Sequence, residues 1–127
     1  MQIPTDGKPL VVLVVEDEFL IRLDAIDYLS GRDMVSLEAV NADQAMEILA
    51  GRRDIDVLFT DVNMPGTMDG LELAKRVREL SPLMGIIVTS GMVHADSEGL
   101  PERVEFFEKP YDLHRIGDCI RHLGHAI

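Results

Sequence analysis

The sequence has no tryptophan, only six other aromatic residues (four phenylalanines and two tyrosines), and a single cysteine, Cys119. One cysteine excludes an internal disulfide and a thiolate cluster for a metal. Basic residues are also scarce: 12 against 23 acidic ones give a net charge of −11. That charge argues against direct binding to nucleic acid or to an anionic membrane, because both need basic patches.

Long apolar runs are missing as well, since none approaches the ~18 residues of a membrane-spanning helix. The first nine residues lack the basic and apolar regions of a signal peptide. We therefore expect a cytoplasmic protein. The length of 127 residues and the apolar content of 46% fit one domain with one core. We expect residues 1–9 to be a disordered lead-in and residues 10–125 to form that domain.

Four short apolar runs each end in polar side chains. Runs of this kind, separated by helix-like segments, are typical of buried parallel strands. The carboxyl ends of parallel strands share one edge of the sheet, where ligands bind. The runs and the residues that follow them are Leu10–Val15 with Glu16 and Asp17, Ile55–Thr60 with Asp61, Gly85–Thr89 with Ser90 and Gly91, and Val104–Phe107 with Lys109. The sequence thus predicts three carboxylates, a hydroxyl and an ammonium group at one edge, a set suited to a divalent cation and a phosphoryl group.

The intervening segments have helical periodicity. Asn41 and Asp69 are expected to be N-caps, with Gln44 and Glu72 three positions later. In contrast, Gly91–Arg103 is too rich in glycine and proline for a regular helix. Helices are predicted at Glu18–Leu29, from Asn41 to about Leu49, from Asp69 with Leu73, Val77 and Leu80 on its inner face, and from Asp112 with a stripe of Leu113, Ile116, Ile120 and Leu123; a weaker strand is predicted at Met34–Val40. The alternation predicts an α/β three-layer sandwich.

Four segments in this order resemble the receiver domain of two-component response regulators. They are VVLVVEDE (Val11–Glu18), LFTDVNMPGTMDG (Leu58–Gly70), the pair Ser90-Gly91 and the pair Lys109-Pro110. The resemblance covers nearly the whole chain. It implies the flavodoxin-like fold, a five-stranded parallel sheet in the order 2-1-3-4-5, here with an irregular or shortened fourth helix. It also implies a cis peptide bond between Lys109 and Pro110.

The resemblance further implies a role for each site residue. Asp61 is the phosphoacceptor, and Lys109 pairs with the phosphoryl group. Mg²⁺ is the implied cofactor, and its ligands are Asp17, Asp61, the backbone carbonyl of Asn63 and, through water, Glu16. Ser90 is the switch hydroxyl and Thr89 the second choice. Adjacent strand residues face opposite sides, and we prefer Ser90 because the small residue after it, Gly91, leaves room for the phosphoryl group. Phe106 is the switch aromatic, and the backbone N–H groups of Val62 and Gly91 are further donors to the phosphoryl group.

These residues also have simpler readings. Glu16 and Asp17 taken alone are well explained as acidic residues at a helix N-terminus, and Lys109 alone as a solvated lysine. Phe106 alone is an ordinary core residue. It is the combination of Glu16, Asp17, Asp61 and Lys109 that favours metal and phosphoryl chemistry.

The function predicted from the sequence is a phospho-accepting switch. It takes its phosphoryl group from a histidine kinase or a histidine phosphotransfer protein and signals to an unidentified downstream protein. The alternatives are a receiver fragment of a larger hybrid kinase or regulator, and a binding module that works without phosphorylation. A phosphatase with Asp61 as nucleophile is disfavoured, because Asn63 stands where haloacid-dehalogenase-like enzymes need a second aspartate. We expect no enzyme activity beyond the chain's own phosphorylation and dephosphorylation.

Overall fold

The computed structural model of the chain describes residues 8–91 and 101–124. The predicted lead-in, residues 1–9, lies for the most part outside the described residues. The same holds for the irregular fourth helix, which was expected within residues 91–103. Within the described ranges, no helix is both long and apolar enough to cross a membrane.

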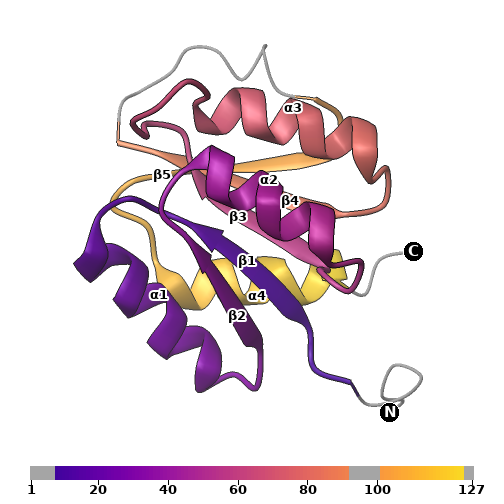
Figure 1. The fold of residues 1–127 in the computed structure, drawn as a ribbon. Helices are drawn as coiled ribbons and strands as arrows, with labels where there is room; N and C mark the ends of the chain where they lie inside the picture. Colours follow the sequence, from indigo (N-terminus) through magenta and orange to yellow (C-terminus); the bar gives the residue numbers. More distant parts are fainter. Residues whose placement is uncertain (1–7, 92–100, 125–127) are drawn as a thin grey trace.

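Five parallel strands form one sheet in the order β2-β1-β3-β4-β5 (Figure 1). Both the parallel sheet and the predicted strand order are therefore confirmed. The central strands are buried on both faces, which explains why they are continuous apolar runs in the sequence. The strands are β1 (Val11–Val15), β2 (Val35–Ala39), β3 (Val57–Asp61), β4 (Gly85–Ser90) and β5 (Val104–Glu108).

The described residues contain four helices, and the two predicted N-caps are confirmed. The side chain of Asn41 accepts a hydrogen bond from the backbone N–H of Gln44 (2.8 Å), and that of Asp69 accepts one from the N–H of Glu72 (2.9 Å). Each cap satisfies a donor that the first helical turn leaves open. The helices are α1 (Phe19–Ser30), α2 (Ala42–Gly51), α3 (Gly70–Leu80) and α4 (Leu113–Gly124).

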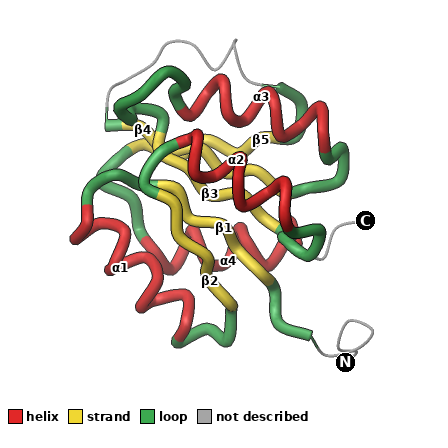
Figure 2. Tube along the Cα trace, viewed as in Figure 1, coloured by secondary structure: helices red, strands yellow, loops and turns green. Residues whose placement is uncertain are grey.

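The helices cover the sheet in two layers (Figure 2). On one face α2 and α3 pack on a cluster that includes Leu13, Leu58 and Val88. On the other face α1 and α4 pack on a cluster that includes Val14, Phe59 and Ile87. Because strand side chains alternate between faces, β1, β3, β4 and β5 each contribute to both cores.

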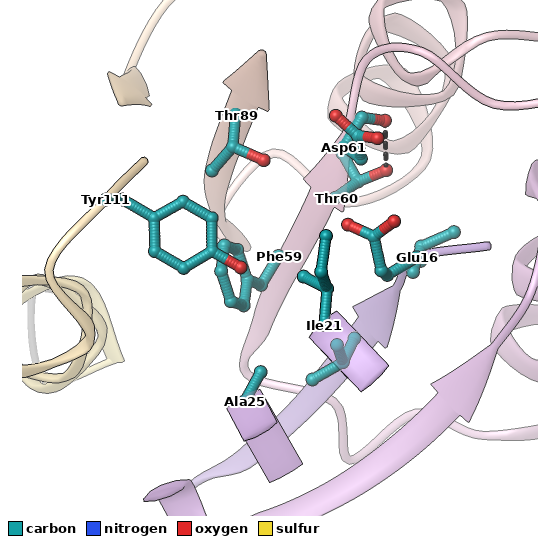
Figure 3. Close-up of a pocket in the computed structure, with 10 residues that line it drawn as sticks. Glu16, Ile21, Ala25, Phe59, Thr60, Asp61, Thr89 and Tyr111 are labelled. Atoms are coloured by element: carbon teal, nitrogen blue, oxygen red, sulfur yellow. Dashed lines mark hydrogen bonds between the residues drawn. The ribbon is translucent and has the colours of Figure 1, made fainter. Parts of the chain in front are cut away.

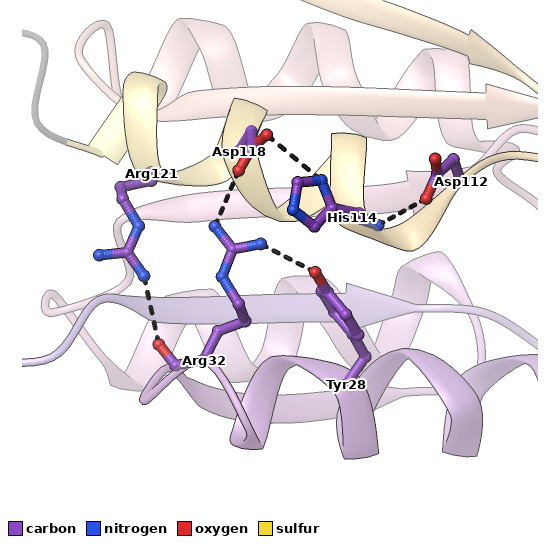
Figure 4. Close-up of polar contacts among 6 residues, drawn as sticks. All are labelled: Tyr28, Arg32, Asp112, His114, Asp118 and Arg121. Atoms are coloured by element: carbon purple, nitrogen blue, oxygen red, sulfur yellow. Dashed lines mark hydrogen bonds and ion pairs between the residues drawn. The ribbon is translucent and has the colours of Figure 1, made fainter.

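Arg32, just beyond the end of α1, ties that helix to α4 (Figure 4). Its guanidinium donates to the hydroxyl of Tyr28 (2.8 Å) and to the carboxylate of Asp118 (2.9 Å). Gly117 makes room for this group, since a Cβ at that position would lie 2.6 Å from Nη1 of Arg32. The two helices are thus held together on one face of the sheet.

Arg78 joins the end of α3 to the segment that enters β5. Its guanidinium donates to the backbone carbonyls of Met84 (2.7 Å), Pro82 (3.0 Å) and Arg103 (3.1 Å), and also to those of Ser81 and Glu102. Burial lowers the pKa of this arginine, and the nearby Arg103 lowers it further. One side chain therefore satisfies the carbonyls of two loops at once.

One predicted core residue is wrong. Leu80 was placed on the inner face of α3 with Leu73 and Val77, but it is 66% exposed while those two are buried. Leu80 is the last residue of α3, where the helix extends beyond the part that covers the core. Helical spacing alone does not reveal where that cover ends.

Candidate functional site

The strand register brings four of the predicted polar residues to one edge and one face of the sheet. Asp61 is the partner of Thr89 across β3 and β4, and Thr89 is the partner of Phe107 in β5. Val15 pairs with Thr60, so Glu16 follows in line with Asp61. Lys109 lies two residues beyond Phe107, on the same face by alternation. Residues separated by up to 93 positions therefore meet above the face that α1 and α4 cover.

Three carboxylates form the centre of the site. Glu16, Asp17 and Asp61 each offer an oxygen, and these oxygens all lie within 4.8 Å of one another. Lys109 Nζ lies 3.3 Å from Oε1 of Glu16 and 3.2 Å from Oδ2 of Asp61. Oδ1 of Asp61 is buried and has no hydrogen-bond partner among the described residues. A carboxylate oxygen without a hydrogen-bond partner, beside two other carboxylates, is a suitable ligand for a hard divalent cation.

Burial and charge act in opposite directions on these groups. Burial raises the pKa of Asp61 and that of Glu16 above their ordinary values, and Lys109 only partly offsets this. Burial would lower the pKa of Lys109, but the carboxylates of Asp61 and Glu16 outweigh it and raise that pKa. The lysine therefore stays charged, and the carboxylates retain an excess negative charge that a cation would relieve.

A narrow pocket opens behind the carboxylates, between the sheet and α1 (Figure 3). Asp61, Glu16 and Thr89 line it together with Tyr111, whose ring closes one side. The ring of Tyr111 meets that of Phe59 edge to face, with centroids 5.7 Å apart. The Lys109–Pro110 bond that precedes Tyr111 is cis, as the resemblance implied.

The structure favours Thr89 over Ser90 as the hydroxyl of the site. Thr89 is in register with Asp61 and lines the same pocket, whereas alternation along β4 directs Ser90 to the face of α2 and α3. The preference for Ser90 rested on the space left by Gly91. The space beside Gly91 does not decide which hydroxyl faces Asp61, because that depends on the register of β3 with β4.

The predicted backbone donors are also revised. The N–H of Val62 donates to the carbonyl of Thr89 (2.8 Å), so it is part of the ladder and does not face the site. The prediction for Val62 is therefore wrong in this structure. The N–H of Asn63 instead lies near the carboxylate of Asp61, where it acts to lower the pKa of that group. Gly91 lies beside the Lys109 stem, with 4.0 Å between a constructed Cβ and Cδ of the lysine, and its donor role stays a prediction.

Phe106 packs on the face of α2 and α3, whereas Phe107 packs on the opposite face. Phe106 is partly buried and pairs with Val88 across β4 and β5. Its side chain is therefore not in the pocket of Thr89 but on the far side of the sheet. A switch role for Phe106 stays a prediction that requires a signal to cross the strand.

Tyr111 was not predicted as part of the site. Its position after Lys109-Pro110 gave no periodic signal, because the chain has already left β5 there. Burial raises its pKa to about 12, and the charges of Glu16, Asp61 and Asp24 add to the effect. The phenol is therefore neutral at physiological pH and able to donate a hydrogen bond.

The raised pKa of Tyr111 predicts a loss of stability in alkali. An unfolded tyrosine ionises near pH ~10, and the folded one near pH 12. Between these values the folded state holds the extra proton, so stability falls as the pH rises, by up to ~1.4 kcal/mol per pH unit from this group. The free energy of unfolding, measured with urea from pH 9 to 12, should decline less steeply for Tyr111→Phe than for the native chain. Tyr28→Phe is the matched control, and a native decline in Tyr111→Phe would contradict the prediction.

Comparison with known proteins agrees with this geometry. The profile of the response regulator receiver domain matches residues 12–121. Sporulation initiation phosphotransferase F of Bacillus subtilis is 26% identical over 115 residues, which are 87% of this chain and 90% of that protein. A response regulator receiver protein from Sinorhizobium medicae has a crystal structure that superposes with a TM-score of 0.83 at 27% identity, covering 94% of this chain and 97% of the other.

The chain therefore belongs to the response regulator receiver domain family, and it is a phospho-accepting switch of two-component signalling. It belongs to a signalling family and not to a family of catalytic enzymes. Some relatives are much longer. The sensor kinase CckA of Brucella abortus is 31% identical over 118 residues, which are 88% of this chain but only 12% of that protein.

Proposed function

We propose that Asp61 is the residue that accepts the phosphoryl group. The observation that carries this is Oδ1 of Asp61, a buried oxygen at the edge of the sheet that has no hydrogen-bond partner among the described residues. In the transfer, a carboxylate oxygen of Asp61 bonds to phosphorus while the bond from phosphorus to the donor histidine nitrogen breaks. Such transfers depend mainly on positioning and electrostatics, so a small set of residues suffices.

We propose Mg²⁺ as the cofactor. Asp17, Asp61 and the carbonyl of Asn63 would hold it directly, and Glu16 through water. Bound there, Mg²⁺ would supply positive charge against the repulsion between the carboxylates and an incoming phosphoryl group. Lys109, already within 3.3 Å of two carboxylates, adds a second positive charge for the phosphoryl oxygens.

The switch itself we assign to Thr89 with Phe106. The Thr89 hydroxyl shares the pocket with Asp61, so a phosphoryl group on Asp61 gives it a new acceptor. The N–H of Gly91 is a further donor. Movement of Thr89 shifts β4, and Phe106 pairs with Val88 in the neighbouring register position. A local charge change is thereby converted into a packing change on the outer strand.

The donor in this proposal is a histidine kinase or a histidine phosphotransfer protein, and the reader of the switch is a further protein in the cytoplasm. The chain catalyses at most its own phosphorylation and dephosphorylation. A receiver that forms part of a longer kinase or regulator would use the same chemistry, as the length of the Brucella relative illustrates. A binding module independent of phosphorylation has no use for the open carboxylate.

The test is intact mass after incubation of the native chain with acetyl phosphate. We expect one adduct of about 80 Da, the mass of a single phosphoryl group, formed with Mg²⁺ and absent when EDTA is present. Borohydride reduction followed by peptide mapping should place it on Asp61. An adduct that forms equally well in EDTA, or that maps to another residue, would reject the proposed site.

A further inference from the structure

Arg22, on the first turns of α1, reaches back to the loop that carries two of the site carboxylates. Its Nη1 donates to the backbone carbonyl of Glu16 at 2.9 Å. Its Nε donates to Oε1 of Glu38 in β2, also at 2.9 Å. The side chain is only 12% exposed, and its guanidinium lies 5.6 Å from the ring centroid of Phe19. A planar donor group with two acceptors and a ring beside it has little freedom to move.

The carbonyl that Arg22 holds belongs to the peptide unit between Glu16 and Asp17. A peptide unit is planar, so the direction of its carbonyl fixes the placement of the two Cα atoms from which the Glu16 and Asp17 side chains extend. The other side of Glu16 is held too, because its N–H donates to the carbonyl of Ala39 in β2 (3.0 Å). The backbone of Glu16 is thus held at its N–H and at its carbonyl. The contact at the carbonyl depends on one side chain, that of Arg22.

We propose that Arg22 is a positioning residue that presets the Glu16–Asp17 peptide for divalent-cation binding. The hydrogen bond from Nε to an oxygen of Glu38 orients the guanidinium, and the hydrogen bond from Nη1 to the carbonyl of Glu16 positions the peptide. Groups that orient metal ligands from outside typically change metal affinity ~10-fold or more when removed. This inference deepens the proposed function, and it rests on that function only for its metal-binding prediction.

Two readouts test it on the full chain. Without metal, the amide of Asp17 should have an NMR order parameter of about 0.85 in the native chain and fall below about 0.6 in Arg22→Met. In isothermal titration with Mg²⁺, Arg22→Met should raise the Kd ~10-fold. Arg22→Lys keeps the charge but has only one compact donor group, so it should give an intermediate Kd.

Glu38→Gln is the matched control. It removes the charge of the ion pair but keeps an oxygen for Nε and leaves the Glu16 contact in place, so its Kd should stay within about 2-fold of native. The inference is overturned if Arg22→Met keeps both a rigid Asp17 amide and the native Kd, or if Glu38→Gln weakens binding as much as Arg22→Met. A native chain that binds no Mg²⁺, but whose Asp17 amide loosens in Arg22→Met, would refute the proposed cofactor and leave the positioning role standing.

Discussion

Asp61→Asn should accept no phosphoryl group and, without Mg²⁺, should be more stable than the native chain by about 1 kcal/mol. An amide oxygen is too weak a nucleophile for phosphoryl transfer. Asparagine nevertheless keeps the shape of the side chain and one of its two oxygens. The substitution removes a buried negative charge that lies near those of Glu16 and Asp17. Lys109 keeps its contact with Glu16, so no cation is left unpaired.

Mg²⁺ should reverse the order of stability. A ligand that binds only the folded state stabilises it by about 1.4 kcal/mol at ten times its Kd, and Asp61→Asn loses a ligand. Urea unfolding of the native chain and of Asp61→Asn, each with and without Mg²⁺, measures this reversal. Asp54→Asn, an exposed change in the Arg52 ion pair, should accept phosphate and respond to Mg²⁺ as the native chain does. A phosphoryl adduct on Asp61→Asn, or a native response of that variant to Mg²⁺, would contradict the prediction.

Gly70→Ala should be the most destabilising single-methyl change near the site, at ~3 kcal/mol. Gly70 is the first residue of α3, and its N–H donates to the carbonyl of Val62 (3.0 Å). A Cβ there would lie 2.0 Å from the carbonyl oxygen of Asp61 and 2.8 Å from the Cα of Val62. Both are backbone atoms at the end of β3, so neither can rotate away. The added methyl group therefore either separates α3 from the sheet or displaces Asp61.

Urea unfolding measures the stability loss, and the rate of adduct formation from acetyl phosphate measures the displacement of Asp61. We expect both to be impaired together. Gly51→Ala is the control, because a Cβ at the end of α2 meets nothing within 4 Å, and alanine is the better helix former. Native stability of Gly70→Ala would show that β3 and α3 move apart at little cost.

Most of the architecture followed from simple patterns in the sequence. The buried strands are continuous apolar runs, and the caps at Asn41 and Asp69 are local signals that need no tertiary context. The carboxylates and Lys109 could be grouped because they follow strands that share an edge. What could not be predicted depends on the register of the strands. Thr89 and not Ser90 lies beside Asp61, because Thr89 is the residue that pairs with Asp61 across β3 and β4. The N–H of Val62 donates to a carbonyl in the same ladder.

Two other features needed the assembled fold. Arg22 has the spacing of an ordinary surface arginine, and no pattern indicates that it turns back to the carbonyl of Glu16. Leu80 has core spacing, but α3 is longer than the core it covers. Long-range contacts of single side chains and the edges of a packed layer are not encoded in short-range periodicity.

The contacts of Arg78 bear on how freely two segments of this domain can change. Met84 lies directly before β4 and Arg103 directly before β5, and the carbonyls of both accept from the guanidinium of Arg78. Because one planar donor group serves both carbonyls, a shift of the guanidinium toward one segment weakens its bond to the other. Sequence changes at the entry to β4 and at the entry to β5 are therefore coupled, and we expect them to be tolerated best in combination.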